Sequence, residues 1–464
     1  MTHYDLIVIG SGPAGQKAAV QAAKLGKRVA IIDRMESMGG VCLHTGTIPS
    51  KTLKEAVLYL SGWSQRGLYG DDYRLKSDLT MQDLQLRLKK TIEREVEVIN
   101  HQLHRNGIET VQGVASFIDP HLVRVEQATG KSLQLKGDSM VIATGTHPYR
   151  PESIPFDGER VLDSDDILQL QQRPRSLTVV GAGVIGVEYA AIFSAMDVEV
   201  TLLDGRQELL GFLDREITDE FIHSLRQRGV SVRLGETVAT MRVDSAAGQV
   251  VTETESGKKI VSEVVLFAAG RSGTTNSLQL DKAGIRVNKR HQIAVNDDYQ
   301  TEVPHIYAAG DVIGFPSLAS TSMEQGRRIA CHAFGKPLVG KLENFPFGIY
   351  AVPEMSMVGE TEQQLMERGV AYDVGIARLR ETARGQIMGI EEGMLKMLFS
   401  LEDQRLLGVH ILGEGATELI HIGQAVLSLG GGIHYFLDSV FNYPTLAEAY
   451  KIAALDAWNR ISRL

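Results

Sequence analysis

The order of apolar and polar positions near the start of the chain predicts a strand, a glycine-rich turn, a helix and a second strand. Residues 4–9 form a short, nearly continuous apolar run, which is typical of a buried strand in a parallel sheet. A turn of sequence Gly-Ser-Gly-Pro-Ala-Gly follows at 10–15, and then an alanine-rich helical stretch that ends before Gly26. The next apolar run, 28–33, ends in an aspartate. This pattern predicts a β-turn-α-β unit.

The same unit returns in residues 177–204. Four features of the first copy recur 171 residues later: Gly10 as Gly181, Gly12 as Gly183, Gly15 as Gly186 and Asp33 as Asp204. One such glycine fingerprint is weak evidence. Two copies, each with an acid 23 residues beyond its first glycine, strongly predict two dinucleotide-binding sites.

The chemistry of such a turn explains the residue types. Glycines let the backbone turn tightly and approach a pyrophosphate, while the helix that follows presents free N–H groups and its positive dipole end. The acid at the end of the second strand accepts hydrogen bonds from ribose hydroxyls. The competing interpretation is a glycine turn that only tightens the packing of helix on strand.

The rest of the chain shows three further patterns. Residues 78–106 are polar and charged with a sparse apolar stripe, which predicts a long helix packed along one side. Three apolar runs, within 139–145, 264–271 and 306–311, lead into a glycine: Gly145, Gly270 and Gly310. From about residue 346 the nucleotide fingerprints stop and strands alternate with helices, which favours an α+β domain.

These patterns predict an α/β protein with two Rossmann-like dinucleotide-binding domains and a C-terminal α+β domain. The expected boundaries are 1–150 for the first domain, 151–275 for the second, 276–340 for a segment that completes the first, and 341–464 for the last.

Composition narrows the possible partners. The formal net charge of −9 and pI near 5.9 argue against a nucleic-acid or anionic-membrane partner. No apolar run approaches the roughly 20 residues of a membrane span, and the N-terminus has no charged region followed by a cleavage site. The two cysteines, Cys42 and Cys331, can form no disulfide scaffold and lie in no metal-ligand spacing. We therefore expect a cytoplasmic protein without a metal.

The segment from Gly39 to Lys51 resembles the redox segment of the pyridine nucleotide-disulfide oxidoreductases, and the resemblance covers nearly the whole chain. In that family two cysteines are separated by four residues. Here Cys42 is followed by Thr47 at the second position, and a threonine hydroxyl cannot form a disulfide. The resemblance implies FAD at the first fingerprint, NAD(P) at the second, and a C-terminal dimerisation domain that makes a homodimer or a larger homo-oligomer.

The resemblance also implies the residues of each site. Those expected at FAD are Gly10, Gly12, Gly15, Asp33, Arg34, Gly39, Gly40, Val41, Cys42, Thr47, Lys51, Ala143, Thr144, Gly145, Gly310, Asp311 and Ala319. Those expected at NAD(P) are Gly181, Gly183, Gly186, Glu188, Asp204, Arg206, Gly270 and Arg271.

A second departure from the family lies near the C-terminus. The dithiol members use a His-Pro dipeptide and a later glutamate from the second subunit as a proton relay; here Tyr443 holds the histidine position and Glu448 the glutamate position. A tyrosine with a pKa near 10 is a poor proton shuttle at neutral pH. Because the second cysteine and the histidine are both replaced, we expect a function without a disulfide.

The most similar subfamily is that of the soluble pyridine nucleotide transhydrogenases, which share the Cys-x-His-x-Gly-Thr-Ile-Pro-Ser-Lys and Asn-Tyr-Pro-Thr segments found at 42–51 and 442–445. This resemblance implies hydride transfer between NADPH and NAD⁺ through FAD, with NAD(H) and NADP(H) as substrates. Two alternatives remain: a diaphorase that passes electrons to a quinone or another acceptor, and a flavin-binding protein without turnover.

Individual roles follow as expectations. Lys51 is expected beside the flavin, where it would stabilise negative charge, and Glu188 is expected to pair with it. The alternative is two unrelated surface charges. Cys42 is expected to serve packing rather than catalysis. The sequence suggests no mechanism for His44.

The preference for NADP or NAD stays open in the sequence. A carboxylate at Asp204 favours NAD(H) and repels the 2′-phosphate of NADP(H), whereas Arg206 can pair with that phosphate. Arg206 equally fits an ordinary surface arginine.

Overall fold

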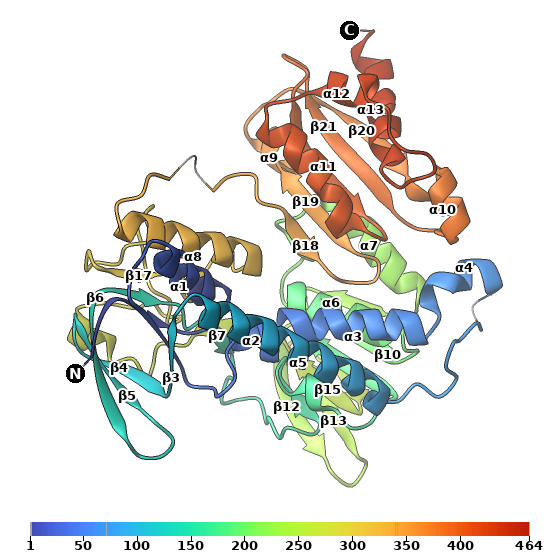
Figure 1. Cartoon of the computed structure of the whole chain (residues 1–464). Helices are drawn as coiled ribbons and strands as arrows, with labels where there is room; N and C mark the ends of the chain where they lie inside the picture. The colour runs from blue at the N-terminus through green and yellow to red at the C-terminus, as the bar shows by residue number, and fades with distance from the viewer. Residues whose placement is uncertain (1, 71, 339, 341, 464) are drawn as a thin grey trace. The chain divides into compact units, whose positions relative to one another are not determined.

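The computed structural model describes residues 2–70, 72–338, 340 and 342–463 (Figure 1). The chain forms two compact units. The first combines Met1–Thr52, Gln85–Tyr149 and Gly270–Leu342; the second combines Leu53–Leu84, Arg150–Ala269 and Glu343–Leu464. Each unit is described by itself.

The first unit is built on a seven-stranded sheet in the order β3-β2-β1-β6-β5-β4, with β17 also paired to β6. Pairing is parallel among β3, β2, β1, β6 and β17 and antiparallel from β6 through β5 to β4. The strands are β1 (Thr2–Ile9), β2 (Val29–Asp33), β3 (Glu109–Gln112), β4 (Val114–Asp119), β5 (Leu122–Glu126), β6 (Ser132–Ile142) and β17 (Ile306–Ala308).

The central strand β1 is buried on both faces, which explains its continuous apolar run. Ile7 and Ile9 belong to one hydrophobic core, while Leu6 and Val8 belong to the core on the opposite face. The second of these cores contains residues of the helices α1 (Pro13–Lys24) and α8 (Ala319–Ala333), which lie side by side in Figure 1.

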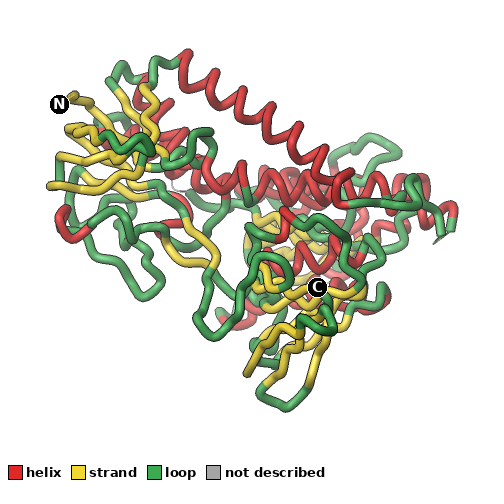
Figure 2. Tube along the Cα trace, turned by 90° about the horizontal axis from the view of Figure 1, so that it is seen from below, coloured by secondary structure: helices red, strands yellow, loops and turns green. Residues whose placement is uncertain are grey.

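Shorter elements complete the first unit: α2 (Gly40–His44), η3 (Leu280–Ala283), η4 (Gly310–Ile313) and the antiparallel pair of β7 (Thr146–Pro148) with β16 (Arg271–Gly273). Of the two longer helices, α3 (Thr47–Leu60) begins within the redox segment and α5 (Met81–Arg105) follows it. Among the described residues α5 is the longest helix, with 25 residues, and Figure 2 shows a long, uninterrupted helix. It agrees with the helix predicted over 78–106.

The second unit contains a parallel sheet in the order β11-β10-β9-β15-β8. Its strands are β8 (Val161–Leu162), β9 (Ser176–Val180), β10 (Glu199–Asp204), β11 (Ser231–Leu234) and β15 (Val264–Phe267). The helix α6 (Val184–Ser194) connects β9 to β10, and α7 (Arg215–Gln227) connects β10 to β11. An antiparallel sheet of β12 (Val238–Asp244), β13 (Gln249–Thr254) and β14 (Lys259–Ser262) lies between β11 and β15 in the sequence.

The C-terminal part of this unit is an antiparallel sheet in the order β18-β19-β22-β21-β20. Its strands are β18 (Phe347–Ile349), β19 (Met355–Gly359), β20 (Tyr372–Arg378), β21 (Met394–Ser400) and β22 (Leu406–Leu412). The helices here are α9 (Glu362–Glu367), α10 (Ala383–Met388), α11 (Ala416–Ser428), α12 (Ile433–Asp438) and α13 (Glu448–Ile461). The remaining short helices of the unit are η1 (Trp63–Gln65), α4 (Arg66–Tyr69), η2 (Ile167–Gln169) and η5 (Leu379–Glu381).

Helices α11 and α13 share one core with the C-terminal sheet. The Tyr450 hydroxyl donates to the carbonyl of Leu419 at 2.8 Å and accepts from the amide of Gly423 at 3.1 Å, so α13 is tied to α11. The predicted fold class, two Rossmann-like domains and a C-terminal α+β domain, is confirmed. The sequence patterns did not predict the β12-β13-β14 sheet or the helices α2 and α3 in the redox segment.

Candidate functional site

The first and third glycines of each fingerprint stand where no other residue fits. A Cβ on Gly10 would lie 2.3 Å from the Ala143 carbonyl oxygen, and one on Gly181 would lie 2.7 Å from that of Ala268. A Cβ on Gly15 would lie 1.9 Å from the Gly10 carbonyl oxygen. These contacts close each turn against its neighbouring strand end, so a side chain there would break the turn.

The second glycine of each fingerprint faces open space instead. A Cβ on Gly12 or on Gly183 would have no heavy atom within 4 Å. These two glycines are the N-cap residues of α1 and α6, and neither helix start is capped by a side chain. The free amides of the first helical turn, which in α1 begin after Pro13 because proline has no N–H, are therefore available to an anion, which is the arrangement that a dinucleotide pyrophosphate requires.

The acid of each fingerprint accepts hydrogen bonds from its own glycine turn. Asp33 is buried, and its Oδ2 accepts from the Ser11 amide at 2.8 Å and from the Ser11 hydroxyl at 2.6 Å. Its Oδ1 accepts from the Met35 amide at 2.9 Å. Ser11, inside the fingerprint, was not among the predicted site residues, although its place between two fingerprint glycines was visible in the sequence.

The start of the redox segment lies directly on the first glycine turn. The Gly39 amide donates to the Ser11 hydroxyl at 2.9 Å, and a Cβ on Gly40 would lie 2.9 Å from the Cα of Gly12. Gly39 and Gly40 have φ of 134° and 63°, which only glycine adopts easily. The carbonyl of Val41 accepts from the amide of Gly46, which closes the turn after α2.

Cys42 and Thr47 meet at the positions that hold two cysteines in the family. Thr47 lies close enough to the Cys42 thiol to act on its pKa, and both Cys42 and Cys331 are free. Burial raises the pKa of the Cys42 thiol, although Thr47 and the nearby Lys51 oppose this. The thiol is therefore protonated at neutral pH. Because both cysteines are free, the prediction that the segment contains no redox disulfide is confirmed. Cys331 is buried in α8.

His44 closes the loop that joins Asp33 to the redox segment. Its Nε2 lies 3.1 Å from the carbonyl oxygen of Ser37, so the end of α2 is tied to residues 34–39. Arg34 in that loop is exposed. This contact gives His44 a place in the first cradle, by which we mean the glycine turn 10–15 together with the start of the redox segment, and the sequence did not suggest it.

Asp311 lies among polar groups at the end of β17. Its Oδ2 accepts from the Thr146 hydroxyl at 3.4 Å, and Thr146 in turn accepts from Nε of Arg271 at 2.8 Å. Burial raises the pKa of Asp311, whereas Arg271 and Thr146 act in the opposite direction. The structure thus brings Arg271, which the resemblance assigns to NAD(P), next to Asp311, which it assigns to FAD. Thr146 was not predicted.

The neighbouring backbone is held by one buried glutamine. Gln325 Oε1 accepts from the amide of Gly310 at 2.8 Å, and Ala319 is the first residue of the helix α8 that carries this glutamine. The turn after β6 contains Ala143, Thr144 and Gly145, and Gly145 has a φ of 64°. Gly270 has a φ of 132°, and its carbonyl accepts from the Tyr149 amide at 3.1 Å.

The remaining predicted residues are placed as follows. Lys51 is in α3, where its Nζ donates to the Ser50 hydroxyl at 3.3 Å. Glu188 is buried in α6, and its Oε1 accepts from the Tyr350 amide at 2.8 Å. The Lys51–Glu188 pair stays a prediction. Tyr443 is 73% exposed, and Glu448 begins α13.

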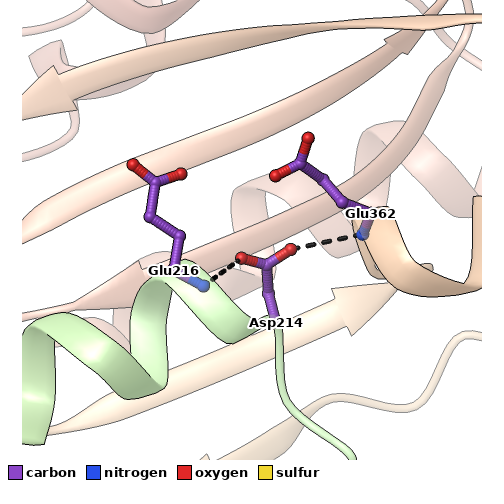
Figure 3. A group of neighbouring side chains, drawn as sticks. All are labelled: Asp214, Glu216 and Glu362. Atoms are coloured by element: carbon purple, nitrogen blue, oxygen red, sulfur yellow. Dashed lines mark hydrogen bonds between the residues drawn. The ribbon is translucent and has the colours of Figure 1, made fainter. Parts of the chain in front are cut away.

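A group of three carboxylates lies outside the first cradle and outside the second, which is the glycine turn 181–186. Figure 3 shows the carboxylate of Asp214 between the backbone nitrogens of Glu216 and Glu362, from which it accepts at 3.1 Å and 3.2 Å. Asp214 therefore caps both α7 and α9. The fully buried Lys396 of β21 donates to Asp214 at 2.8 Å, lies 3.0 Å from Glu216 and also bonds Glu362. The ammonium group of Lys396 supplies one buried positive charge that all three carboxylates share.

Comparison with known proteins agrees with this geometry. Residues 4–326 match the model of the family described as pyridine nucleotide-disulphide oxidoreductase, and residues 345–454 match the dimerisation domain of the same family. The chain belongs to the pyridine nucleotide-disulphide oxidoreductases. This family membership was predicted from the Gly39–Lys51 segment and is confirmed.

Particular relatives cover the chain from end to end. It is 54% identical over 465 residues to the soluble pyridine nucleotide transhydrogenase of Mycobacterium tuberculosis, with 100% of this chain and 99% of that protein aligned. It is 44% identical to the soluble pyridine nucleotide transhydrogenase of Colwellia psychrerythraea, over 99% of this chain and 98% of that protein. A solved structure of the HOCl-induced flavoprotein disulfide reductase RclA from Escherichia coli superimposes with a TM-score of 0.88 at 28% identity, over 98% of this chain and 99% of that chain.

Within the described ranges, no helix is both long enough and apolar enough to cross a membrane.

Proposed function

We propose that the chain transfers hydride between NADPH and NAD⁺ with FAD as the resident cofactor. FAD, when bound, takes a hydride from one nicotinamide and returns it to another, so that NADPH and NAD⁺ become NADP⁺ and NADH. The proposal is supported by the full-length similarity to relatives named soluble pyridine nucleotide transhydrogenases.

The observation that carries the proposal is the pairing of Cys42 with Thr47. In a disulfide reductase the electrons leave the flavin through two thiols, whereas here the thiol faces a hydroxyl and both cysteines are free. Because this segment has no disulfide that could take electrons from the reduced flavin, we propose a second nicotinamide as the electron acceptor.

The first cradle fits FAD. Gly12 leaves open space at the uncapped start of α1, and Gly39 and Gly40 close over the same turn. Asp311 is a largely buried carboxylate with one hydroxyl donor, Thr146, so it can accept further hydrogen bonds from the ribityl chain. The other residues proposed for FAD are those named for it above.

The second cradle is proposed for NAD(P). Gly183 leaves the same open space at the uncapped start of α6, and Asp204 occupies the place that Asp33 has in the first copy. Glu188 and Lys51 are proposed to lie beside the nicotinamide and the flavin. Gly270 and Arg271 remain proposed for the nucleotide, with Arg271 also next to Asp311.

The assembly is proposed to be a homodimer. The region matching the dimerisation domain exposes large apolar side chains, among them Leu429 at 87%, Val440 at 94% and Tyr443 at 73%. Such exposure is typical of a surface that a second copy covers. In the dimer, Tyr443 and Glu448 would face the partner's flavin. The cytoplasmic location and the domain boundaries at 150, 275 and 340 remain predictions.

The experiment uses the purified protein with FAD bound. NADPH is added together with a thionicotinamide analogue of NAD⁺, whose reduced form absorbs at a different wavelength. The proposal predicts steady reduction of the analogue, with parallel double-reciprocal lines as both nucleotides are varied. Rapid oxidation of NADH by a quinone or dye without reduction of the analogue would replace the proposal with a diaphorase. Absence of any flavin reduction would leave only a flavin-binding role.

A further inference from the structure

The two acids of the fingerprints differ in their side-chain partners: Asp33 accepts from the Ser11 hydroxyl, whereas Asp204 accepts from the Arg206 guanidinium. In both copies, Oδ2 accepts from the amide that follows the first glycine, and Oδ1 accepts from the amide two residues beyond the acid. In the second copy these donors are Ala182 at 2.6 Å and Arg206 at 2.8 Å. The outward sides of the Asp204 oxygens then accept from the Arg206 side chain, through Nε at 3.0 Å and Nη2 at 2.7 Å.

The first copy acts as an internal control for this contact. The residue that matches Arg206 is Met35, which lies 171 positions earlier and is 49% exposed. Its backbone amide makes the same bond to Asp33, but its side chain has no donor. The backbone hydrogen bonds to the acid occur in both copies and therefore follow from the fold. The paired hydrogen bonds from the Arg206 guanidinium to Asp204, called the clasp below, occur in the second copy alone.

The clasp changes what Asp204 presents to a nucleotide. Burial of Asp204 opposes ionisation, but the Arg206 side chain and the two amides outweigh it and hold the pKa of Asp204 below its usual value. The carboxylate is thus ionised, and the guanidinium bound to it cancels its charge. A 2′-phosphate approaching this point meets a neutral pair rather than a bare carboxylate.

Arg206 also keeps donors for a ligand while it holds Asp204. A guanidinium has five N–H groups, and two of them serve Asp204, so three remain. The side chain is 60% exposed, whereas Asp204 is 8% exposed. The backbone of Arg206 is fixed, because its carbonyl accepts from the Gly235 amide at 2.8 Å. The guanidinium can therefore turn outward without any movement of the turn.

We propose that Asp204 and Arg206 form one recognition element that accepts either a 2′-hydroxyl or a 2′-phosphate. With a 2′-phosphate, Arg206 stays on Asp204 and directs its remaining N–H groups to the phosphate. With a 2′-hydroxyl, the guanidinium turns outward and the ribose hydroxyls take its place on the carboxylate. This inference rests on the proposed function, since exchange between NADPH and NAD⁺ needs one site that holds both.

The test measures binding of two fragments that carry no nicotinamide, adenosine 2′,5′-bisphosphate and 5′-AMP, to the FAD-loaded protein by calorimetry. The variants are Arg206→Met, which copies the residue of the first fingerprint, Asp204→Asn and the double variant. The control is Arg242→Gln, which removes another exposed arginine near a carboxylate, Asp244, on β12. Thermal melting of each variant checks that it is folded.

Arg206→Met is expected to weaken binding of the bisphosphate about 10- to 100-fold, because it removes the phosphate donor and exposes the charge of Asp204. Binding of 5′-AMP should change less than about threefold, and Arg242→Gln should change neither. Asp204→Asn alone should alter the affinity for the bisphosphate less than about threefold. In the double variant, Asp204→Asn should restore about tenfold of the bisphosphate affinity that Arg206→Met removes.

Two results would overturn the inference. One is an Arg206→Met variant that binds the bisphosphate as tightly as the wild type. The other is an equal gain from Asp204→Asn in both backgrounds, which would mean that Arg206 does not neutralise the acid. The fragments bind without hydride transfer, so a failed transhydrogenase assay with a coupled pair would reject the proposed function and leave this inference standing.

Discussion

At the scale of single residues, His44 connects the cofactor cradle to the redox segment. Its ring contacts the Ser37 carbonyl, and the loop between them leads from Asp33 to Gly39. His44→Ala should therefore loosen this loop and raise the dissociation constant of FAD, by about 5- to 10-fold for one lost hydrogen bond in a partly buried place. His44→Gln can keep the bond and should retain most of the affinity. Fluorescence of released FAD on dilution measures both, and equal affinity in all three proteins would contradict the role.

Cys42 gives a pH prediction. Because burial raises the pKa of its thiol, the reactive thiolate is scarce at neutral pH and becomes abundant only as the pH rises above the usual thiol range. Alkylation of Cys42 by iodoacetamide should be slow at pH near 7 and accelerate steadily above about pH 9. Mass spectrometry of the labelled peptide gives the rate, with Cys42→Ser to assign the signal. Fast labelling at neutral pH would show an activated thiol instead.

At the scale of elements, Lys396 holds three elements of the second unit together. Its ammonium group on β21 bonds the residues that cap and begin α7 and α9. Lys396→Met leaves the buried carboxylate of Asp214 without its cation and should destabilise folding by about 3–5 kcal/mol. The matched control is Lys259→Met, whose ion pair with Glu253 is exposed and should be worth less than about 1 kcal/mol. Urea denaturation compares the two, and a similar small effect for both would contradict the structural role.

The same cluster determines the pH range over which wild type and Lys396→Met differ by a constant free energy of unfolding. The pKa of Asp214 lies below its ordinary value of 3.8: burial works against this, but His410 and Lys396 outweigh it. The pKa of Lys396 lies above its ordinary 10.5, because Asp214 and Glu362 outweigh burial. The contribution of the acid is lost only as the pH falls below about 4, and that of the lysine only as it rises above about 10. The pKa of His410, which burial lowers from its usual 6.5, also depends on Lys396, so the gap between wild type and Lys396→Met should stay constant only from about pH 7 to pH 9.

The elements also show what sequence could and could not predict. The strands β1, β2, β9 and β10 and the helix α5 were predicted because their apolar patterns are local and strong. The contacts of Ser11 with Asp33, of Thr146 with Asp311 and of Lys396 with Asp214 were not predicted, because each joins residues distant in sequence. Arg206 was left open because its direction depends on a side-chain conformation that spacing does not encode.

At the scale of the whole molecule, the exposed apolar residues of the C-terminal region should be covered in a dimer. Val440→Asp places a charge on a side chain that is 94% exposed in the single chain. If a second copy covers it, the variant should shift the protein towards monomer in analytical ultracentrifugation. Val261→Asp, at a 50% exposed position of β14, is the control and should leave the assembly unchanged. A Val440→Asp protein that sediments like wild type would place the interface elsewhere.

The central claim is that hydride passes between two nicotinamides without any thiol. The most direct measurement is a single turnover without oxygen, in which the FAD-loaded protein receives one equivalent of NADPH and then the thionicotinamide analogue of NAD⁺. The account predicts that the flavin absorbance bleaches and returns while one equivalent of analogue is reduced. It also predicts a similar rate and stoichiometry for Cys42→Ser, since a serine keeps a small polar group beside Thr47 but has no thiol. A bleached flavin that the analogue does not restore, or a Cys42→Ser variant that has lost the transfer, would contradict it.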